Sequence, residues 1–279
     1  MRAETPFHVR LWPDDAPDMV DLPAALRPAL RVFPAGDRPA STVVVFPGGG
    51  YGMVSPNEGE PVARWLNRAG FTALVVTYRV APHVFPLGLR DAVRAVRLAR
   101  SRADEWGVRP DRLAVMGFSA GGHLAGSLAT LGEDVALMGD EELMNVLPRP
   151  NALVLCYPVI TMTPPFAHEG SVRNLHGAAA AETERTAWSL ERRVSADSPP
   201  TFLWHTAPDE AVPVENSLLF AGALAHHRVP FALHVFPRGR HGLNLATDEP
   251  LASAWPDLCA AWLHETLGSR DATSAPARS

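Results

Sequence analysis

The sequence predicts an α/β fold in which a mostly parallel central sheet is covered by helices on both faces. Short apolar runs rich in β-branched residues alternate with segments whose apolar residues recur at helical spacing, over about 200 residues. Most of the apolar runs lack polar alternation, as expected for parallel strands that are buried on both faces. Alternation of strand and helix over such a length is typical of a parallel sheet flanked by helices.

The predicted strands are six short apolar runs: 42–46 (TVVVF), 72–78 (TALVVTY), 113–116 (LAVM), 153–157 (LVLCY), 201–205 (TFLWH) and 231–236 (FALHVF). The predicted helices are the segments 61–69, 89–106, 121–131, 214–226 and 251–267. The second of these shows the pattern best, because Arg and Asp occupy the side opposite a helically spaced set formed by Leu89, Ala92, Val93, Val96 and Ala99.

The chain is predicted to form one domain over residues 1–268. Residues 1–25 are rich in Pro and Asp and indicate an irregular arm or an edge strand. Two connections, 132–150 and 161–200, are longer than is usual between strand and helix. Since the second follows the carboxyl end of a strand, it is the predicted cap insertion. Residues 269–279 indicate a flexible tail.

Composition excludes several function classes. A net charge of −5 and a pI near 6.1 do not favour binding to nucleic acid or to an anionic membrane, which both attract basic proteins. All basic residues are arginine, so a Schiff-base lysine, a Ser–Lys dyad and a P-loop lysine are absent. The apolar run 152–160 is shorter than the ~20 residues of a membrane span. Charges and prolines interrupt residues 1–15, where a signal peptide would need an unbroken apolar stretch, so none is expected. Cys156 and Cys259 lie in apolar runs typical of buried free thiols, and we therefore expect a cytoplasmic protein.

The segment 117–122 (GFSAGG) contains a G-x-S-x-G motif between a predicted strand and a predicted helix. That context is typical of a sharp turn that presents a nucleophilic serine, here Ser119. We expect glycine to be required at positions 117 and 121, because a Cβ at either position would clash with the adjoining strand and helix. The alternative is a glycine-rich loop with a solvent-facing serine.

A serine nucleophile needs a base, and the base needs a third group to orient it. His241 follows the last predicted strand, so it lies at the same sheet edge as Ser119 and is the predicted base. Asp209 follows the strand 201–205 and is the predicted orienting acid, with Glu210 as the alternative. The chain order Ser, Asp, His is that of the α/β-hydrolase triad.

Three other histidines are expected to have structural rather than catalytic roles. His205 and His234 fall inside predicted strands and are expected to be hydrogen-bonded core residues. His123, in the first turn of the helix after Ser119, is interpreted as structural. No Cys/His cluster has metal-ligand spacing, so no metal is expected.

The loop after the strand 42–46 reads PGGGYG and is the predicted oxyanion site. Successive glycines let a backbone approach substrate with its N–H groups exposed. The predicted donors are the N–H groups of Gly49, Gly50 and Ala120. The loop lacks G-x-G-x-x-G spacing and the chain lacks a Walker lysine, so nucleotide binding is not expected.

These residues together resemble the α/β-hydrolase superfamily, and within it the small acetyl esterases described as acetylxylan esterase-like or feruloyl-esterase-like. The resemblance covers about residues 43–267 and is carried by PGGGYGMVSPNEGEPVARWL, YRVAP, DRLAVMGFSAGGHLAGSL, TFLWHTAPDEAVPVENS and FPRGRHGL. Two positions depart from it: Pro47 replaces a His that many relatives carry, and Pro208 replaces a second Asp.

The resemblance implies a serine esterase that needs no cofactor and works through an acyl-enzyme on small-molecule esters. Short-chain acyl esters are expected, with acetylated sugars or xylo-oligosaccharides as substrates. Separately, Tyr51 in the glycine loop and His168 in the long insertion are predicted substrate contacts. A peptidase or amide hydrolase of the same fold and a non-catalytic binding protein are the alternatives. The sequence assigns no role to Glu58 and no oligomeric state.

Overall fold

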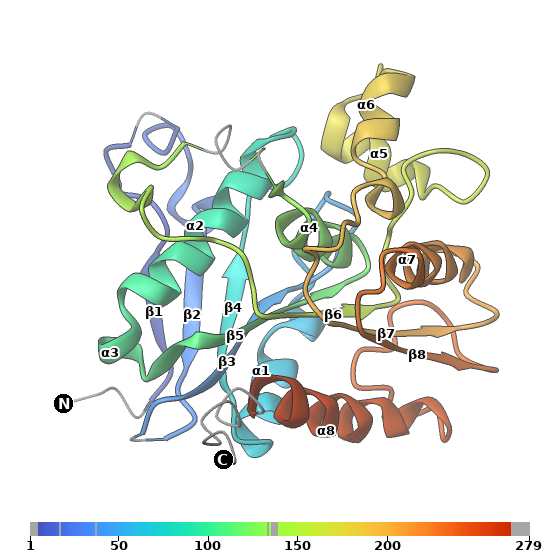
Figure 1. Ribbon diagram of the computed structural model, residues 1–279. Coiled ribbons are helices and arrows are strands. Elements are labelled where there is room, and N and C mark those ends of the chain that lie inside the picture. Colours follow the sequence, from blue (N-terminus) through green and yellow to red (C-terminus); the bar gives the residue numbers. More distant parts are fainter. Residues whose placement is uncertain (1–4, 17, 37, 133, 135–138, 269–279) are drawn as a thin grey trace, which may run out of the picture.

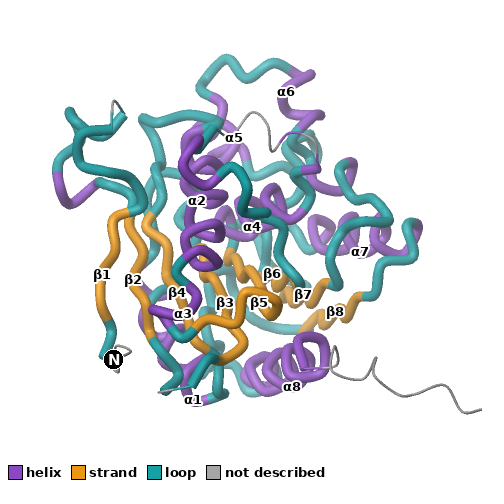
Figure 2. The backbone as a smooth tube through the Cα atoms, turned by 60° about the vertical axis from the view of Figure 1, so that its left-hand side comes forward, coloured by secondary structure: helices purple, strands orange, loops and turns teal. Residues whose placement is uncertain are grey.

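The computed structural model describes residues 5–16, 18–36, 38–132, 134 and 139–268. Within them eight strands form one sheet in the order β1-β2-β4-β3-β5-β6-β7-β8 (Figures 1 and 2). Their bounds are β1 Phe7–Arg10, β2 Ala29–Phe33, β3 Ala40–Phe46, β4 Thr72–Thr77, β5 Val108–Phe118, β6 Ala152–Cys156, β7 Thr201–Thr206 and β8 Phe231–Phe236. Neighbouring strands are parallel from β4 to β8, whereas β2 is antiparallel to β1 and β4.

Helices cover both faces of the sheet. Below it in Figure 1 lie α1 (Glu60–Arg68) and α8 (Trp255–Gly268). Above it lie α2 (Leu87–Ser101), α4 (Ala120–Ala129) and α7 (Glu215–His226), with the short α3 (Ala103–Trp106) beyond α2. The buried apolar residues accordingly form two clusters, one on each side of the sheet. The structure is an α/β-hydrolase fold, as the sequence predicted.

The six predicted strands and five predicted helical segments are present with shifted ends, except that the predicted helix 89–106 is divided at Arg102 into α2 and α3. The arm at the N-terminus contributes the edge strand β1, one of the two alternatives given for it. The strand β2 was missed, although its residues alternate, with Leu30 and Val32 facing the α2 side. Its remaining side chains include Arg31, which is why it did not resemble the buried apolar runs of the parallel strands.

The Arg and Asp side of α2 is covered rather than exposed. Asp91 is fully buried and accepts hydrogen bonds from Arg79 Nη2 and Trp12 Nε1, both at 2.7 Å. Arg94 pairs with Glu142 at 2.7 Å, and its guanidinium lies 4.6 Å from the Trp12 ring centroid. Charges removed from water need such partners, and the partners here tie the N-terminal arm and the loop after α4 to this helix.

The predicted cap insertion carries α5 (Glu169–His176) and α6 (Glu182–Ala187). It is packed against the domain, because Val172, Leu175 and Leu190 are buried in the same apolar cluster as α2 and α4. The predicted tail, 269–279, lies outside the described residues.

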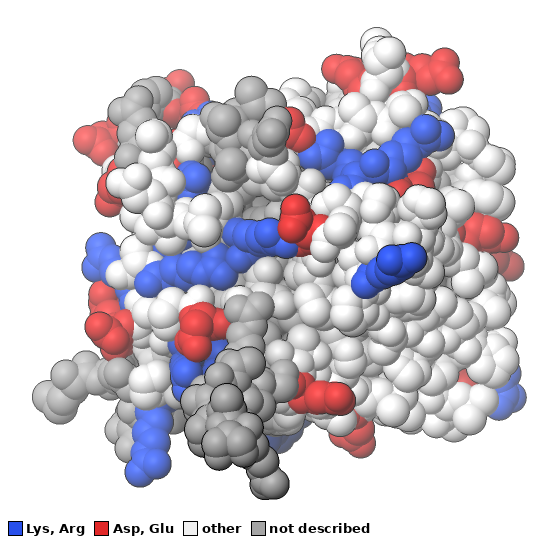
Figure 3. Space-filling model, viewed as in Figure 1, with Lys and Arg blue, Asp and Glu red and all other residues white. Residues whose placement is uncertain are grey.

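Charges of both signs are interspersed on the face shown in Figure 3, where arginines and acidic side chains lie close to one another. Among the described helices, none is long and apolar enough to cross a membrane. Cys156 and Cys259 are buried free thiols, as predicted.

Candidate active site

Ser119 occupies a sharp turn between β5 and α4. Its backbone has φ 51° and ψ −121°, a conformation that costs a non-glycine residue about 1–3 kcal/mol. A Cβ on Gly117 would lie 2.1 Å from the carbonyl oxygen of Gly121, and a Cβ on Gly121 would lie 2.1 Å from that of Phe46. The predicted steric need for glycine on both sides of the serine is therefore confirmed.

Replacing Gly121 by alanine is expected to destabilise the fold by about 3 kcal/mol or more, because the strand-end carbonyls of Phe46 and Pro47 have no room to retreat. Guanidinium unfolding measures the loss. Gly222→Ala is the matched control, since Gly222 is exposed on α7 and its added Cβ meets nothing within 4 Å. That control should gain about 0.5–1 kcal/mol. Wild-type stability of Gly121→Ala would contradict this account of the turn.

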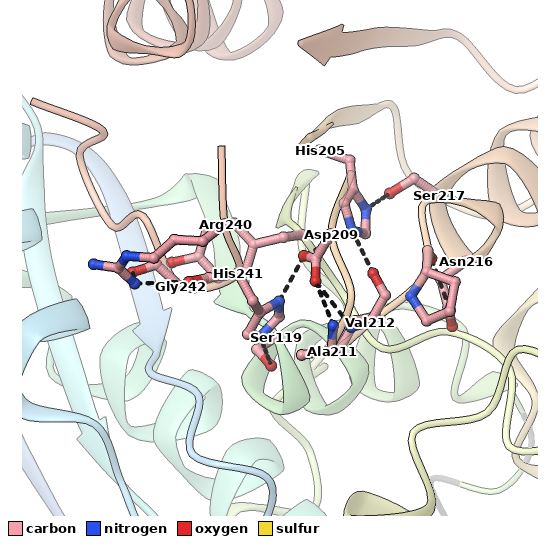
Figure 4. Close-up of polar contacts among 12 residues, drawn as sticks. Ser119, His205, Asp209, Ala211, Val212, Asn216, Ser217, Arg240, His241 and Gly242 are labelled. Carbon is pink, nitrogen blue, oxygen red and sulfur yellow. Dashed lines mark hydrogen bonds and ion pairs between the residues drawn. The ribbon is translucent and has the colours of Figure 1, made fainter. Parts of the chain in front are cut away.

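Three side chains from separate loops meet at the carboxyl ends of the strands (Figure 4). His241 Nε2 lies 2.8 Å from Ser119 Oγ, and His241 Nδ1 lies 2.7 Å from Asp209 Oδ2. With its proton on Nδ1, the imidazole donates to Asp209 and accepts from the serine hydroxyl. The structure thus joins all three predicted side chains in one line of hydrogen bonds, which can pass a proton away from Ser119.

Asp209 is held as a carboxylate by donors on every side. Its Oδ1 accepts the N–H groups of Ala211 and Val212, each at 3.0 Å, and its Oδ2 lies 3.3 Å from His205 Nε2. Burial by itself would raise the pKa of Asp209, but the hydrogen bonds from His205, His241 and Val212 outweigh it and hold the pKa well below its usual value. An ionised acid is what a base at His241 requires.

His205 is the hydrogen-bonded core histidine that the sequence predicted, and it also contacts the site. Its ring is fully buried, with Nδ1 2.8 Å from Ser217 Oγ and Nε2 3.0 Å from the carbonyl of Val212. The prediction that His234 is also a hydrogen-bonded core residue was wrong. Because β8 is an edge strand, His234 is only partly buried and packs its ring against Phe202.

The glycine loop after β3 lies beside the serine turn. Phe46 pairs with Gly117 in the parallel register of β3 and β5, so both strands end next to each other. A Cβ on Gly48 would lie 3.0 Å from Ser119 Cβ. The carbonyl of Pro47 accepts a 2.6 Å hydrogen bond from the Tyr78 hydroxyl, which helps to hold the loop in place.

The three predicted oxyanion donors are backbone N–H groups without an acceptor in the described part of the chain. Gly49 and Gly50 have positive φ values of 120° and 62°, which turn the chain within the loop. Ala120 is the first residue of α4, so its N–H has no partner inside the helix. Within the described residues no acceptor takes the N–H groups of Gly49, Gly50 or Ala120. Unengaged N–H groups beside a nucleophile suit a developing oxyanion, which is the role predicted for them.

The prediction that Tyr51 contacts substrate was wrong. Its side chain is only 2% exposed, and its hydroxyl lies 2.8 Å from Nδ1 of the buried His123. The Nε2 atom of His123 lies 2.8 Å from the carbonyl of Trp188 in the insertion. Burial lowers the pKa of His123 to about 3, so this neutral ring is structural, as predicted, and connects the Tyr51 loop to the insertion.

His168, a predicted substrate contact, lies beside the glycine loop and close enough to His241 for the two rings to interact electrostatically. Its Nδ1 accepts from the Ser171 N–H at 3.1 Å and lies 2.8 Å from Ser171 Oγ, which leaves Nε2 to carry the proton. A Cβ on Gly50 would lie 3.7 Å from its Cε1. Burial, followed by the neighbouring His241, lowers the pKa of His168. A neutral Nε2–H donor therefore borders the glycine loop.

Three further residues hold the site and were not assigned by the sequence analysis. Asn174 of α5 donates from Nδ2 to the carbonyl of Gly50 at 2.9 Å. Glu58 and Tyr157 connect the glycine loop to the loop of His241, as described below. Neither periodicity nor motif spacing marks them, although Glu58 lies in one of the stretches that carry the family resemblance.

An apolar hollow of about 620 Å³ lies behind the glycine loop, over β2 and β4. Its lining includes Phe33, Met53, Val75 and Tyr78, but neither Ser119 nor His241. It is therefore separate from the proton-transfer line.

Comparison with known protein families shows which family the chain belongs to. The sequence profile of the family BD-FAE matches residues 32–224, more than half of the chain. The chain belongs to the BD-FAE family. The match runs from β2 into α7, so it includes Ser119 and Asp209 and ends before His241. Membership confirms the resemblance to acetyl esterases of the α/β-hydrolase superfamily.

Individual relatives of this BD-FAE member include enzymes named for xylan. This chain is 44% identical over 219 residues to endo-1,4-β-xylanase B of Butyrivibrio fibrisolvens, and the match covers 76% of this chain and 34% of that protein. It is 32% identical over 213 residues to the acetylxylan esterase of Xylanibacter ruminicola, covering 74% and 41%. The chain therefore spans well under half the length of these two relatives.

A solved structure resembles nearly the whole chain. The acetyl ester-xyloside bifunctional hydrolase from Caldicellulosiruptor lactoaceticus superimposes with a TM-score of 0.86 and 42% identity. The match covers 94% of this chain and 96% of that one.

Proposed function

We propose that this chain is a serine carboxylic-ester hydrolase that removes short acyl groups, acetyl above all, from small-molecule esters. The observation that carries the proposal is the line of hydrogen bonds from Ser119 Oγ through His241 to Asp209, at 2.8 and 2.7 Å. It ends beside the glycine loop, in which the N–H groups of Gly49 and Gly50 have no acceptor among the described residues. Membership of the BD-FAE family supports the same chemistry.

In the first half of the reaction, Ser119 Oγ attacks the carbonyl carbon of the ester while its proton passes to His241 Nε2. The carboxylate of Asp209 stabilises the imidazolium that forms. The N–H groups of Ala120, Gly49 and Gly50 hold the oxygen that becomes negative. As the tetrahedral intermediate collapses, the carbon–oxygen bond to the alcohol breaks, and the alcohol leaves with the proton from His241.

In the second half, water attacks the acyl-enzyme. His241 takes one proton from the water and returns it to Ser119 Oγ as the acid is released. His168 is proposed to donate its Nε2–H to a substrate oxygen beside the glycine loop. We further infer that residues 161–200 act as a cap within a single domain, since Asn174 and Trp188 of that segment hydrogen-bond to Gly50 and His123.

Acetylated sugars are the proposed substrate class, and xylo-oligosaccharide esters are the first to test. One relative is named an acetylxylan esterase, and the similar solved structure is named an acetyl ester-xyloside bifunctional hydrolase. The large apolar hollow is separate from Ser119, so the structure offers no argument for a long acyl chain.

A panel of p-nitrophenyl esters tests the acyl preference. We expect acetyl and propionyl esters to react at least about tenfold faster in kcat/KM than the octanoyl ester, because each methylene that a pocket does not accept costs about 1 kcal/mol or more. Acetylated xylose and xylo-oligosaccharides complete the panel, with p-nitroacetanilide as the amide control. A best rate with decanoyl or longer esters would refute the preference, and a better rate on the amide would favour the amide-hydrolase alternative.

A further inference from the structure

Glu58 is a buried acid that the proposed chemistry does not use. It ends the short turn η2 (Pro56–Glu58) after the glycine loop and is 5% exposed. No arginine or histidine in the described part of the chain forms an ion pair with it. A buried carboxylate without a cationic partner is costly, by several kcal/mol, unless hydrogen-bond donors replace the lost water. The groups that it holds should therefore explain its presence.

Two donors from different loops share this carboxylate. Glu58 Oε2 accepts the N–H of Gly48 at 2.7 Å, and Glu58 Oε1 accepts the hydroxyl of Tyr157 at 2.7 Å. The carboxylate packs closely against Gly48, because a Cβ added to Gly48 would lie only 2.9 Å from Glu58 Oε2. Gly48 directly precedes Gly49, so the carboxylate fixes the peptide that leads into the proposed oxyanion donors.

Tyr157 extends the connection to the loop of His241. Its ring lies edge to face with the imidazole of His241, at 5.0 Å between centroids. Its hydroxyl oxygen accepts the N–H of Asn244 at 3.0 Å. Asn244 in turn donates from Nδ2 to the carbonyl of Asn57, next to Glu58. The loops after β3, β6 and β8 thus meet around one carboxylate.

Both carboxylate oxygens act as acceptors at the same time. Burial raises the pKa of Glu58, and the hydrogen bonds from Tyr157 and Gly48 act against it and favour the ionised form. A protonated acid or an amide would direct a hydrogen either at the Gly48 N–H or at the Tyr157 oxygen, and the tyrosine hydroxyl would then have to turn its own proton away from Glu58. Only the carboxylate satisfies both loops without a conflict between donors.

We propose that Glu58 is a positioning residue that fixes the oxyanion loop relative to the loop of His241, so that both face Ser119. This inference rests on the proposed function. A loop displaced by about 1 Å can cost on the order of 10² in rate even when the reacting groups are intact. The effect should fall on kcat, because the contacts that Glu58 makes are with loops rather than with substrate.

The test is the kinetics of Glu58→Gln with a p-nitrophenyl acetate assay. We expect kcat to fall by about 10²-fold and KM to change by less than about threefold. The fraction of protein that a fluorophosphonate finally labels counts the folded sites and normalises kcat. Glu60→Gln is the matched control, since Glu60 lies two positions away, is partly exposed, and pairs with Arg31 and Arg64. It should keep wild-type kcat.

Tyr157→Phe gives an independent measurement. It keeps the ring against His241 and removes the hydroxyl, so kcat should fall, though less than in Glu58→Gln. In the double variant the amide introduced by Glu58→Gln no longer meets the tyrosine O–H, so the combined loss should be smaller than the product of the two single losses. If Glu58→Gln yields no folded protein, Tyr157→Phe decides, since unchanged kcat at full labelling would overturn the proposal.

The remaining outcomes separate this inference from the function beneath it. Normalised kcat of Glu58→Gln within threefold of wild type overturns the role of Glu58, as does a loss that equals the drop in labelled fraction. A wild-type protein without esterase activity, or an active Ser119→Ala, instead contradicts the proposed function.

Discussion

Ser119→Ala is expected to lower kcat on p-nitrophenyl acetate by about 10⁶-fold, because the nucleophile and the proton-transfer line disappear together. Little else should change. The hydroxyl's described hydrogen bond is the one to His241, and alanine fits the space that serine leaves. Circular dichroism and the thermal midpoint should therefore match wild type, and a fluorophosphonate should no longer label the protein.

Ser253→Ala is the control for this experiment. Ser253 is exposed and lies in the turn η6 (Ala252–Ala254) before α8, outside the hydrogen-bonded line of the site, and its hydroxyl donates only to the carbonyl of Pro250 among the described residues. It should keep full activity and full labelling. A near-wild-type kcat for Ser119→Ala would contradict the proposal that Ser119 is the nucleophile. Fluorophosphonate labelling of a different residue would identify that residue as the nucleophile instead.

Asp209→Asn is expected to lower kcat by about 10⁴-fold. Every described neighbour of this carboxylate is a donor, and Oδ1 already takes two backbone N–H groups. The amide oxygen of asparagine would keep those two, so its NH₂ group would face His241 Nδ1. The imidazole would then carry its proton on Nε2, directed at Ser119 Oγ, and could no longer accept the serine proton.

Glu210→Gln is the matched control for Asp209→Asn. Glu210 is adjacent in sequence and exposed, and it was the alternative acid in the sequence analysis. It should keep wild-type kcat over the whole pH range of the assay. A larger loss in Glu210→Gln than in Asp209→Asn would show that the acid is misassigned.

The sequence was informative where a residue type is dictated by local geometry. Gly117 and Gly121 could be predicted because a strand, a serine and a helix in succession leave no space for a Cβ. The order of strands and helices could be predicted because burial on both faces selects apolar runs. The strand β2 escaped because one of its faces carries Arg31, which pairs with Glu60.

Side-chain direction was harder to predict than position. Tyr51 lies in the glycine loop, as a substrate contact would, but its φ of 59° belongs to a turn whose side chain packs inward against His123 and Tyr78. His205 was correctly assigned to the core, yet only its contact with Asp209 reveals that it also supports the acid. In both cases the deciding neighbour lies outside the local pattern that the sequence analysis could use.

By itself the sequence predicted most of the strands and helices, the turn at Ser119 and the proposed roles of His241 and Asp209, because each depends on local spacing or on the rule that parallel strands end at one edge. Only the tertiary structure decided which groups touch. The meeting of Gly48, Tyr157 and Asn244 around Glu58 involves three loops, and a hydrogen bond between them depends on distances of a few ångströms that no local pattern encodes.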